Sequence, residues 1–123
     1  MKIAFKMLGL VMLTFLFSCT KDYYQPPDTG AQDVSFKNEI IPVFKSNCIS
    51  CHQTGMTKPD LTENHAYSEL TTNNEYVVPG KPNESELYHR VTGMGGMMPP
   101  GGMMAPTNTD KIKAWIEQGA LNN

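Results

Sequence analysis

Two cysteines and a histidine form the most chemically specific stretch of this sequence. Cys48 and Cys51 are separated by two residues, and His52 follows at once. This spacing is typical of covalent attachment of a c-type haem, because two thiols so placed can add across the two vinyl groups on one edge of a porphyrin. The histidine then lies beneath the ring and can offer a ring nitrogen to the iron. The motif therefore predicts a haem site with His52 as the proximal ligand.

A second group of soft ligands lies downstream, in a loop of glycine, proline and methionine. Five of the eleven residues from Met94 to Met104 are methionine. Apolar filling is the commoner role of methionine, but it does not readily explain all five in a glycine-rich loop. A thioether ligand favours reduced iron. Met98 directly precedes two prolines, which stiffen the loop, so we expect Met98 to be the distal ligand, with Met97 as the runner-up.

The N-terminal residues predict export. Lys2 and Lys6 precede an apolar run of eleven residues that ends at Phe17, shorter than the roughly 20 residues that span a bilayer. The run ends in Leu16-Phe17-Ser18-Cys19, which resembles a bacterial lipobox, although Phe17 is bulkier than usual at its position. We therefore expect residues 1–18 to be a lipoprotein signal peptide and Cys19 to carry the lipid. The alternative is an ordinary secretory signal with a chance cysteine.

The remaining composition narrows the function classes. With Cys19 assigned to lipid, only two thiols remain, so a structural disulfide framework is not expected. After removal of residues 1–18, eight Lys and Arg face twelve Asp and Glu, a net charge of −4. This balance gives no support to nucleic-acid binding. It would suit docking to a basic redox partner, although an ordinary solvated surface gives the same count.

The rest of the chain must position these ligands. Residues 19–33 contain Pro-Pro, glycine and polar residues without periodicity, which predicts a flexible linker. Residues 34–123 form the domain, small for a self-sufficient apolar core, and a large buried cofactor would relieve that shortage. No strand-like alternation is present, so the sequence predicts an all-α domain with long loops.

Four helices are predicted in this domain. The first begins at an N-cap on Ser35, is bent or divided by Pro42, and runs into the cysteine motif. The later helices are expected near residues 65–70, at 84–91 with Asn83 as cap, and at 110–118 with Thr107 or Thr109 as cap and Gly119 as the C-terminal stop.

Four stretches together carry a resemblance to a known family: Ile41-Pro42-Val43-Phe44, the cysteine motif, Met98-Pro99-Pro100, and Ile112–Ile116 with Gly119-Ala120. They resemble the class I-type monohaem cytochrome c domain of exported bacterial proteins, over about residues 36–120. The resemblance implies a small cytochrome c-like fold, about four short helices and long loops wrapped around one covalently attached haem.

The same resemblance implies roles for particular residues. Cys48 and Cys51 would form the thioethers, His52 and Met98 would bind the iron, and the protein would transfer electrons. The N- and C-terminal helices would cross, and the second ring nitrogen of the proximal histidine would donate to a backbone carbonyl. We expect that carbonyl in the loop around Lys58-Pro59.

Alternatives remain for the distal ligand of the iron and for the identity of the cofactor. Several methionines could ligate, and His65 or His89 could give a bis-histidine site. A haem enzyme or sensor would have an exchangeable distal ligand and would need an acid or base there, whereas the loop offers thioethers and glycines. Other readings are a dithiol redox protein, a zinc site completed by His65 or His89, and a Met-rich copper-handling lipoprotein.

The interpretation that the residues favour is an electron carrier, not an enzyme. No nucleophile triad, phosphate loop or paired carboxylates are apparent in the sequence. We expect an exported protein, lipid-anchored to a membrane and facing the periplasm. Its expected partners are redox proteins that give and take single electrons.

Overall fold

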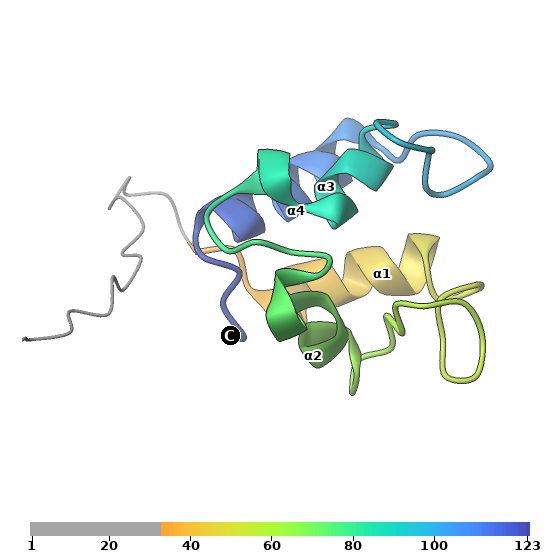
Figure 1. The fold of residues 1–123 in the computed structure, drawn as a ribbon, viewed down its shortest axis with the longest axis horizontal. Coiled ribbons are helices and arrows are strands. Elements are labelled where there is room, and N and C mark those ends of the chain that lie inside the picture. The colour runs from red at the N-terminus through yellow and green to blue at the C-terminus, as the bar shows by residue number, and fades with distance from the viewer. Residues whose placement is uncertain (1–32) are drawn as a thin grey trace, which may run out of the picture.

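The computed structural model describes residues 33–123, so the predicted signal peptide, the lipid site Cys19 and almost all of the predicted linker lie outside the described residues. The described part of the chain folds into helices and turns without a strand, which confirms the all-α prediction. The helices are a π-helical turn at Phe36–Ile40, α1 at Ile41–Asn47, α2 at Ala66–Thr71, α3 at Glu86–Val91 and α4 at Pro106–Glu117, with 3₁₀ turns at Thr72–Asn74 and Pro82–Glu84. Figure 1 shows α3 and α4 on one side of the molecule and α1 and α2 on the other.

The N-terminal helix begins and divides where the sequence predicted. The hydroxyl of Ser35 accepts a hydrogen bond from the Asn38 backbone N–H at 3.1 Å, and the Ser35 N–H donates to Oε2 of Glu39 at 3.0 Å. These two bonds satisfy donors that a helix start leaves unpaired. Pro42 lies in the first turn of α1, where its missing N–H removes no necessary bond. The helix therefore runs in two pieces and delivers the chain to Cys48.

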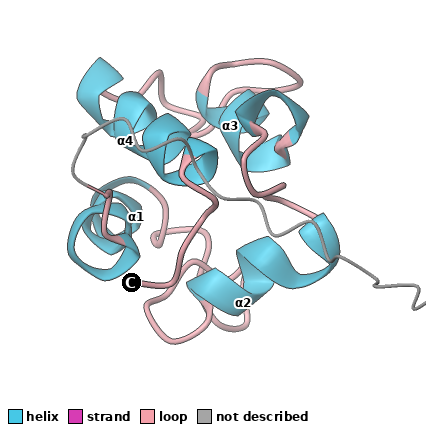
Figure 2. Ribbon diagram, turned by 90° about the vertical axis from the view of Figure 1, so that its left-hand side faces the viewer, coloured by secondary structure: helices cyan, strands magenta, loops and turns pink. Residues whose placement is uncertain are grey.

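The N- and C-terminal helices cross, as the resemblance implied. The Phe36 ring lies 5.0 Å from the Trp115 ring of α4 and 5.4 Å from the Tyr67 ring of α2, measured between centroids. The Trp115 indole N–H donates to the Leu121 carbonyl at 2.9 Å, which satisfies its polar atom within the core. Figure 2 shows α4 lying across the end of the molecule that contains α1.

Apolar side chains from every helix complete this core. Aromatic and branched residues predominate, so the packing is dense and specific. The fully buried members with the largest side chains, apart from the ring contacts above, are Phe44, Ile40, Leu70, Ile112, Ile116 and Val77.

Two predicted helix starts were wrong. Helix α3 begins at Glu86 with Ser85 at the N-cap, not at Glu84 after Asn83, because Pro82 starts a separate 3₁₀ turn. Helix α4 begins at Pro106, four residues before the predicted start at Asp110, and no threonine side chain caps it. Proline suits a first helical position because its φ is already helical and its missing N–H is not needed there.

The C-terminal end of α4 follows the prediction. Gly119 has a φ of +97°, a conformation open to glycine at little cost. Among residues 33–123, no helix is long and apolar enough to cross a bilayer.

Candidate functional site

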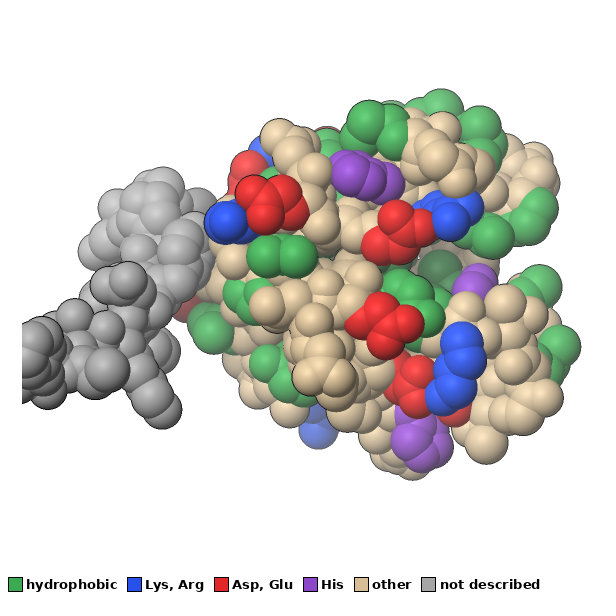
Figure 3. All heavy atoms as spheres, viewed as in Figure 1, with side chains coloured by type: hydrophobic (Ala, Val, Ile, Leu, Met, Phe, Trp, Pro, Cys, Tyr) green, Lys and Arg blue, Asp and Glu red, His purple; other side chains and the backbone are tan. Residues whose placement is uncertain are grey.

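A cavity of about 460 Å³ lies between the two sides of the fold. This volume is in the range of small-molecule and cofactor sites. One side, here called the proximal wall, is the segment 47–61 that contains the cysteine motif. The opposite side, the distal wall, comprises α3 and residues 92–105, the methionine loop. Figure 3 shows the cleft between the two sides, with both apolar and charged side chains around its opening.

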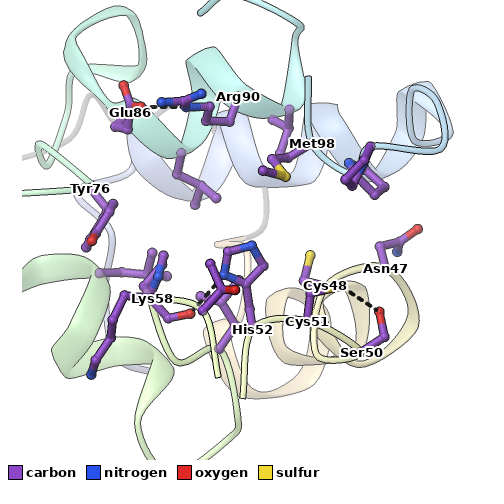
Figure 4. A pocket seen from close by; sticks show the side chains of 18 residues that line it. Asn47, Cys48, Ser50, Cys51, His52, Lys58, Tyr76, Glu86, Arg90 and Met98 are labelled. Carbon is purple, nitrogen blue, oxygen red and sulfur yellow. Dashed lines mark hydrogen bonds and ion pairs between the residues drawn. The ribbon is translucent and has the colours of Figure 1, made fainter. Parts of the chain in front are cut away.

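His52 projects from the proximal wall into this cavity (Figure 4). Its Nδ1 lies 3.1 Å from the carbonyl oxygen of Pro59. A carbonyl can only accept, so Nδ1 carries a proton, and Nε2 is the nitrogen whose lone pair a metal can use in the neutral ring. The expected acceptor in the Lys58-Pro59 loop is therefore confirmed. Such a bond fixes the orientation of a metal-binding imidazole and raises its basicity.

The two cysteines line the same cavity beside His52. A tight turn brings the motif together, since the N–H groups of Cys51 and His52 both approach the Cys48 carbonyl, at 3.1 and 3.0 Å. Burial raises the pKa of the Cys48 thiol to about 11. The attacking cysteine of a redox-active pair has a lowered pKa, so the environment of Cys48 does not favour it in dithiol exchange.

Met98 faces His52 from the distal wall, with its sulfur directed into the cavity (Figure 4). It is the one methionine among the described residues that lines the cavity. Met97, the runner-up, is 42% exposed. Two further methionines of the loop, Met94 and Met103, are also exposed, and Met104 is buried in the core.

The methionine loop is attached to the end of α3. The Met98 backbone N–H donates to the Arg90 carbonyl at 2.9 Å. The Arg90 guanidinium donates through Nη1 to the Gly95 carbonyl and through Nε to Oε1 of Glu86, the latter at 2.6 Å. These bonds place Met98 although its neighbours are glycines and prolines.

Neither alternative histidine lies at the cavity. His65 is exposed, and its Nδ1 lies 3.3 Å from Oδ2 of Asp60. His89 places Nε2 2.8 Å from the Asn83 carbonyl. Within residues 33–123, no group of three or more His, Cys, Asp or Glu side chains could hold a metal ion. The geometry therefore supports neither the bis-histidine nor the zinc alternative.

Three polar residues near the site were not singled out from the sequence. Glu86 and Tyr76 line the cavity, and Asp60 is buried in the loop that carries Pro59. The signal for Asp60 was present, because Asp followed two residues later by Thr is a common side-chain-to-backbone turn. Glu86 precedes Arg90 by four residues, the spacing of a helical ion pair.

These residues fit a haem. Leu61, Leu70, Leu87 and Val91 give the cavity apolar walls that suit a porphyrin face. An imidazole nitrogen without a hydrogen-bond partner among the described residues faces a thioether across the space, and nitrogen and sulfur are a donor pair that haem iron accepts.

Comparison with known proteins identifies the family. No match was found among curated proteins or among solved structures. The family model for cytochrome c matches residues 42–120, more than half of the 123-residue chain. The matched segment contains the cysteine motif, both walls of the cavity and all of α4. The chain therefore belongs to the cytochrome c family, and its domain is a haem-binding c-type cytochrome.

Proposed function

We propose that the protein is a monohaem electron carrier. In this proposal Cys48 and Cys51 form thioethers with one haem, and its iron is held between Nε2 of His52 and the sulfur of Met98. The observation that carries the proposal is that these two side chains enter one apolar cavity from opposite walls, with both cysteines at its border. When bound, haem supplies a one-electron iron couple.

Residues around the site would control ligand binding to the iron and its reduction potential. The Pro59 carbonyl keeps the proton on Nδ1 of His52, so Nε2 stays available as a donor. The soft thioether of Met98 favours the reduced state and raises the potential. The apolar walls would limit the contact of a bound haem with water, and so the reorganisation of solvent when the charge changes.

The distal wall favours a carrier over an enzyme or sensor. An enzyme needs an acid or base beside the open position of the iron. The one carboxylate among the described cavity residues, Glu86, is paired with Arg90. Met98 instead presents a group that ligates and does not transfer protons. This supports a closed, six-coordinate site.

The lips of the cavity suggest how redox partners dock. No Asp, Glu, Lys or Arg occurs in residues 46–57 or in residues 91–109, the two segments here called the lips. The charged residues that line the cavity, Lys58, Glu86 and Arg90, lie outside these segments. Four exposed methionines lie in these segments: Met56, Met94, Met97 and Met103. We propose that donor and acceptor proteins dock here, at the cysteine edge of the haem, through uncharged faces of their own.

The predicted N-terminal segment completes the proposal. Lipid on Cys19 would anchor the protein to a membrane, facing the periplasm. Residues 20–33 would act as a linker that lets the domain reach a donor and an acceptor in turn. This role depends on sequence alone, because these residues precede the described domain.

A pair of cysteine variants tests attachment and anchoring separately. The full chain is expressed with haem-maturation machinery and is fractionated into membrane and soluble pools. The wild-type protein should retain haem on a denaturing gel and should sediment with membranes. The double variant Cys48→Ser, Cys51→Ser should lose the haem stain while it remains in the membrane pool.

The Cys19→Ser variant should behave in the opposite way, retaining haem but appearing in the soluble pool. A wild-type protein without covalent haem would contradict the electron-carrier proposal. Unchanged membrane association of Cys19→Ser would contradict the lipid anchor and leave the haem proposal unaffected.

A further inference from the structure

Asp60 is buried and highly connected, yet it does not line the cavity. Its side chain is 5% exposed, and it is the one buried acid among the described residues. Oδ2 accepts a hydrogen bond from the Thr54 hydroxyl at 2.6 Å. Oδ1 accepts from the Thr62 hydroxyl at 2.6 Å and from the Thr62 backbone N–H at 3.0 Å. We call these three residues the Asp60 knot.

The Asp60 knot closes the loop that holds the proximal histidine. Thr54 follows His52 by two residues, and Asp60 directly follows Pro59, whose carbonyl accepts from Nδ1 of His52. The Leu61 N–H also donates to the His52 carbonyl at 2.9 Å. Residues 53–61 contain no helix, so these side-chain bonds fix a backbone that regular structure does not.

We propose that Asp60 is a positioning residue for His52, which fixes the Pro59 carbonyl and adds a permanent negative charge behind the proximal imidazole. The inference depends on the proposed ligation of iron by His52. A fixed carbonyl keeps the Nδ1–H bond short and well aligned. The carboxylate favours positive charge on the imidazole and the iron, so it stabilises the oxidised state and lowers the reduction potential.

The other charged groups beside the Asp60 knot are paired or exposed, so we assign the effect on the reduction potential to Asp60. Lys58 and Glu69 form an ion pair with each other beside the knot, so their charges largely cancel. His65 is exposed to solvent, although its Nδ1 approaches Asp60 at 3.3 Å. Hydrogen bonds from Thr54 and Thr62 lower the pKa of Asp60 to about 2, so the carboxylate stays ionised at neutral pH.

The test compares Asp60→Asn with Glu63→Gln in the haem-loaded protein. Both changes remove one negative charge, but Glu63 is exposed and forms its ion pair with Lys45, outside the knot. Two quantities are measured: the midpoint reduction potential and the hydrogen-exchange rate of the His52 Nδ1–H, followed by NMR. We expect Asp60→Asn to raise the potential and to speed exchange by about tenfold, the equivalent of one hydrogen bond to a charged group. Glu63→Gln should leave the exchange rate unchanged and shift the potential less.

A milder variant covers the case in which Asp60→Asn does not fold. Thr54→Val removes one donor to Asp60 but keeps the shape of the side chain and the charge of the carboxylate. It should speed exchange of the His52 Nδ1–H without the rise in potential that loss of the charge produces. The variant Thr54→Ser, which keeps the hydroxyl donor to Asp60, should have an exchange rate close to that of the wild type.

Two negative outcomes are distinct. If the wild-type protein holds haem but Asp60→Asn matches Glu63→Gln in potential, and neither Asp60→Asn nor Thr54→Val speeds exchange, the Asp60 inference is overturned alone. If the wild-type protein carries no covalent haem, or His52 is not its iron ligand, the proposed function fails first.

Discussion

The two walls of the cavity hold their ligands in different ways. On the proximal wall, His52 is the last residue of a tight turn and is fixed through Pro59 and the Asp60 knot. On the distal wall, Met98 lies in a loop with five glycines between residues 92 and 105, and bonds to Arg90 attach that loop to α3. Both sets of contacts are local in sequence, since His52 precedes Pro59 by seven residues and Arg90 precedes Met98 by eight. The proximal contacts converge on a buried carboxylate, whereas the distal contacts come from the last turn of a short helix.

Lowering the pH should destabilise the proximal wall and leave the stability of the distal loop unchanged. Hydrogen bonds from Thr54 and Thr62 lower the pKa of Asp60 from its ordinary value of 3.8 to about 2. A carboxyl group whose pKa falls on folding adds stability that is complete above the unfolded pKa and is lost as the pH drops through the folded one. The distal loop, residues 92–105, has no ionisable side chain.

The contribution of the Asp60 charge is the difference in free energy of unfolding between the wild-type protein and Asp60→Asn. The wild-type advantage in free energy of unfolding should be complete above about pH 4, decline between pH 4 and 2, and vanish below about pH 2. Urea unfolding of the haem-loaded proteins at a series of pH values measures it. An advantage that is independent of pH would show that the Asp60 charge plays no part.

A substitution at Gly96 should loosen the distal loop. Gly96 has a φ of +108°, and a Cβ there would lie 2.7 Å from Nη1 of Arg90. Gly96→Ala would strain the backbone and displace the guanidinium that binds Gly95, at a cost of about 1–3 kcal/mol in free energy of unfolding. Urea unfolding measures the loss, and the sulfur-to-iron absorption should weaken in parallel.

Two neighbouring glycines serve as controls for that loss. A Cβ at Gly101 would meet nothing within 4 Å, and its φ lies outside the left-handed region, so Gly101→Ala should change stability by less than about 0.5 kcal/mol. Gly95 has a φ of +77° with open space around it, so Gly95→Ala isolates the backbone strain. Equal effects of Gly96→Ala and Gly95→Ala would show that the Arg90 contact does not hold the loop.

The smallest effect is expected from salt, because the proposed docking edge, residues 46–57 and 91–109, contains no Asp, Glu, Lys or Arg. Electron self-exchange between oxidised and reduced copies brings two such edges together, and NMR line broadening measures its rate. The rate should change by less than about twofold between roughly 0.01 and 0.15 M salt, a range over which the screening length falls from about 30 to 8 Å. A steep salt dependence would indicate docking through the charged surface instead.

The sequence predicted the proximal side more completely than the distal side. The cysteine spacing, the Ser35 cap and the division at Pro42 all follow from local rules, and the structure has each of them. The expected acceptor for His52 in the Lys58-Pro59 loop is also present. Local chemistry was sufficient wherever the interacting groups lie within a few residues of one another.

The remaining features required a choice among several local signals that the sequence did not rank. The threonines at 107 and 109 are good caps in isolation, yet α4 starts earlier, at Pro106, whose fixed φ suits a first helical position. The choice between Met97 and Met98 depended on the prolines that follow. The sequence held no sign that the Arg90 carbonyl would fix Met98, because that contact joins a helix end to a loop.

The most direct test of iron held between His52 and Met98 is the visible spectrum of the purified, oxidised protein with matched methionine variants. The wild-type protein and Met97→Ala should both show the sulfur-to-iron band near the red end of the spectrum. Met98→Ala should lose this band and still retain covalent haem. Persistence of the band in Met98→Ala, or its loss in Met97→Ala, would contradict the account.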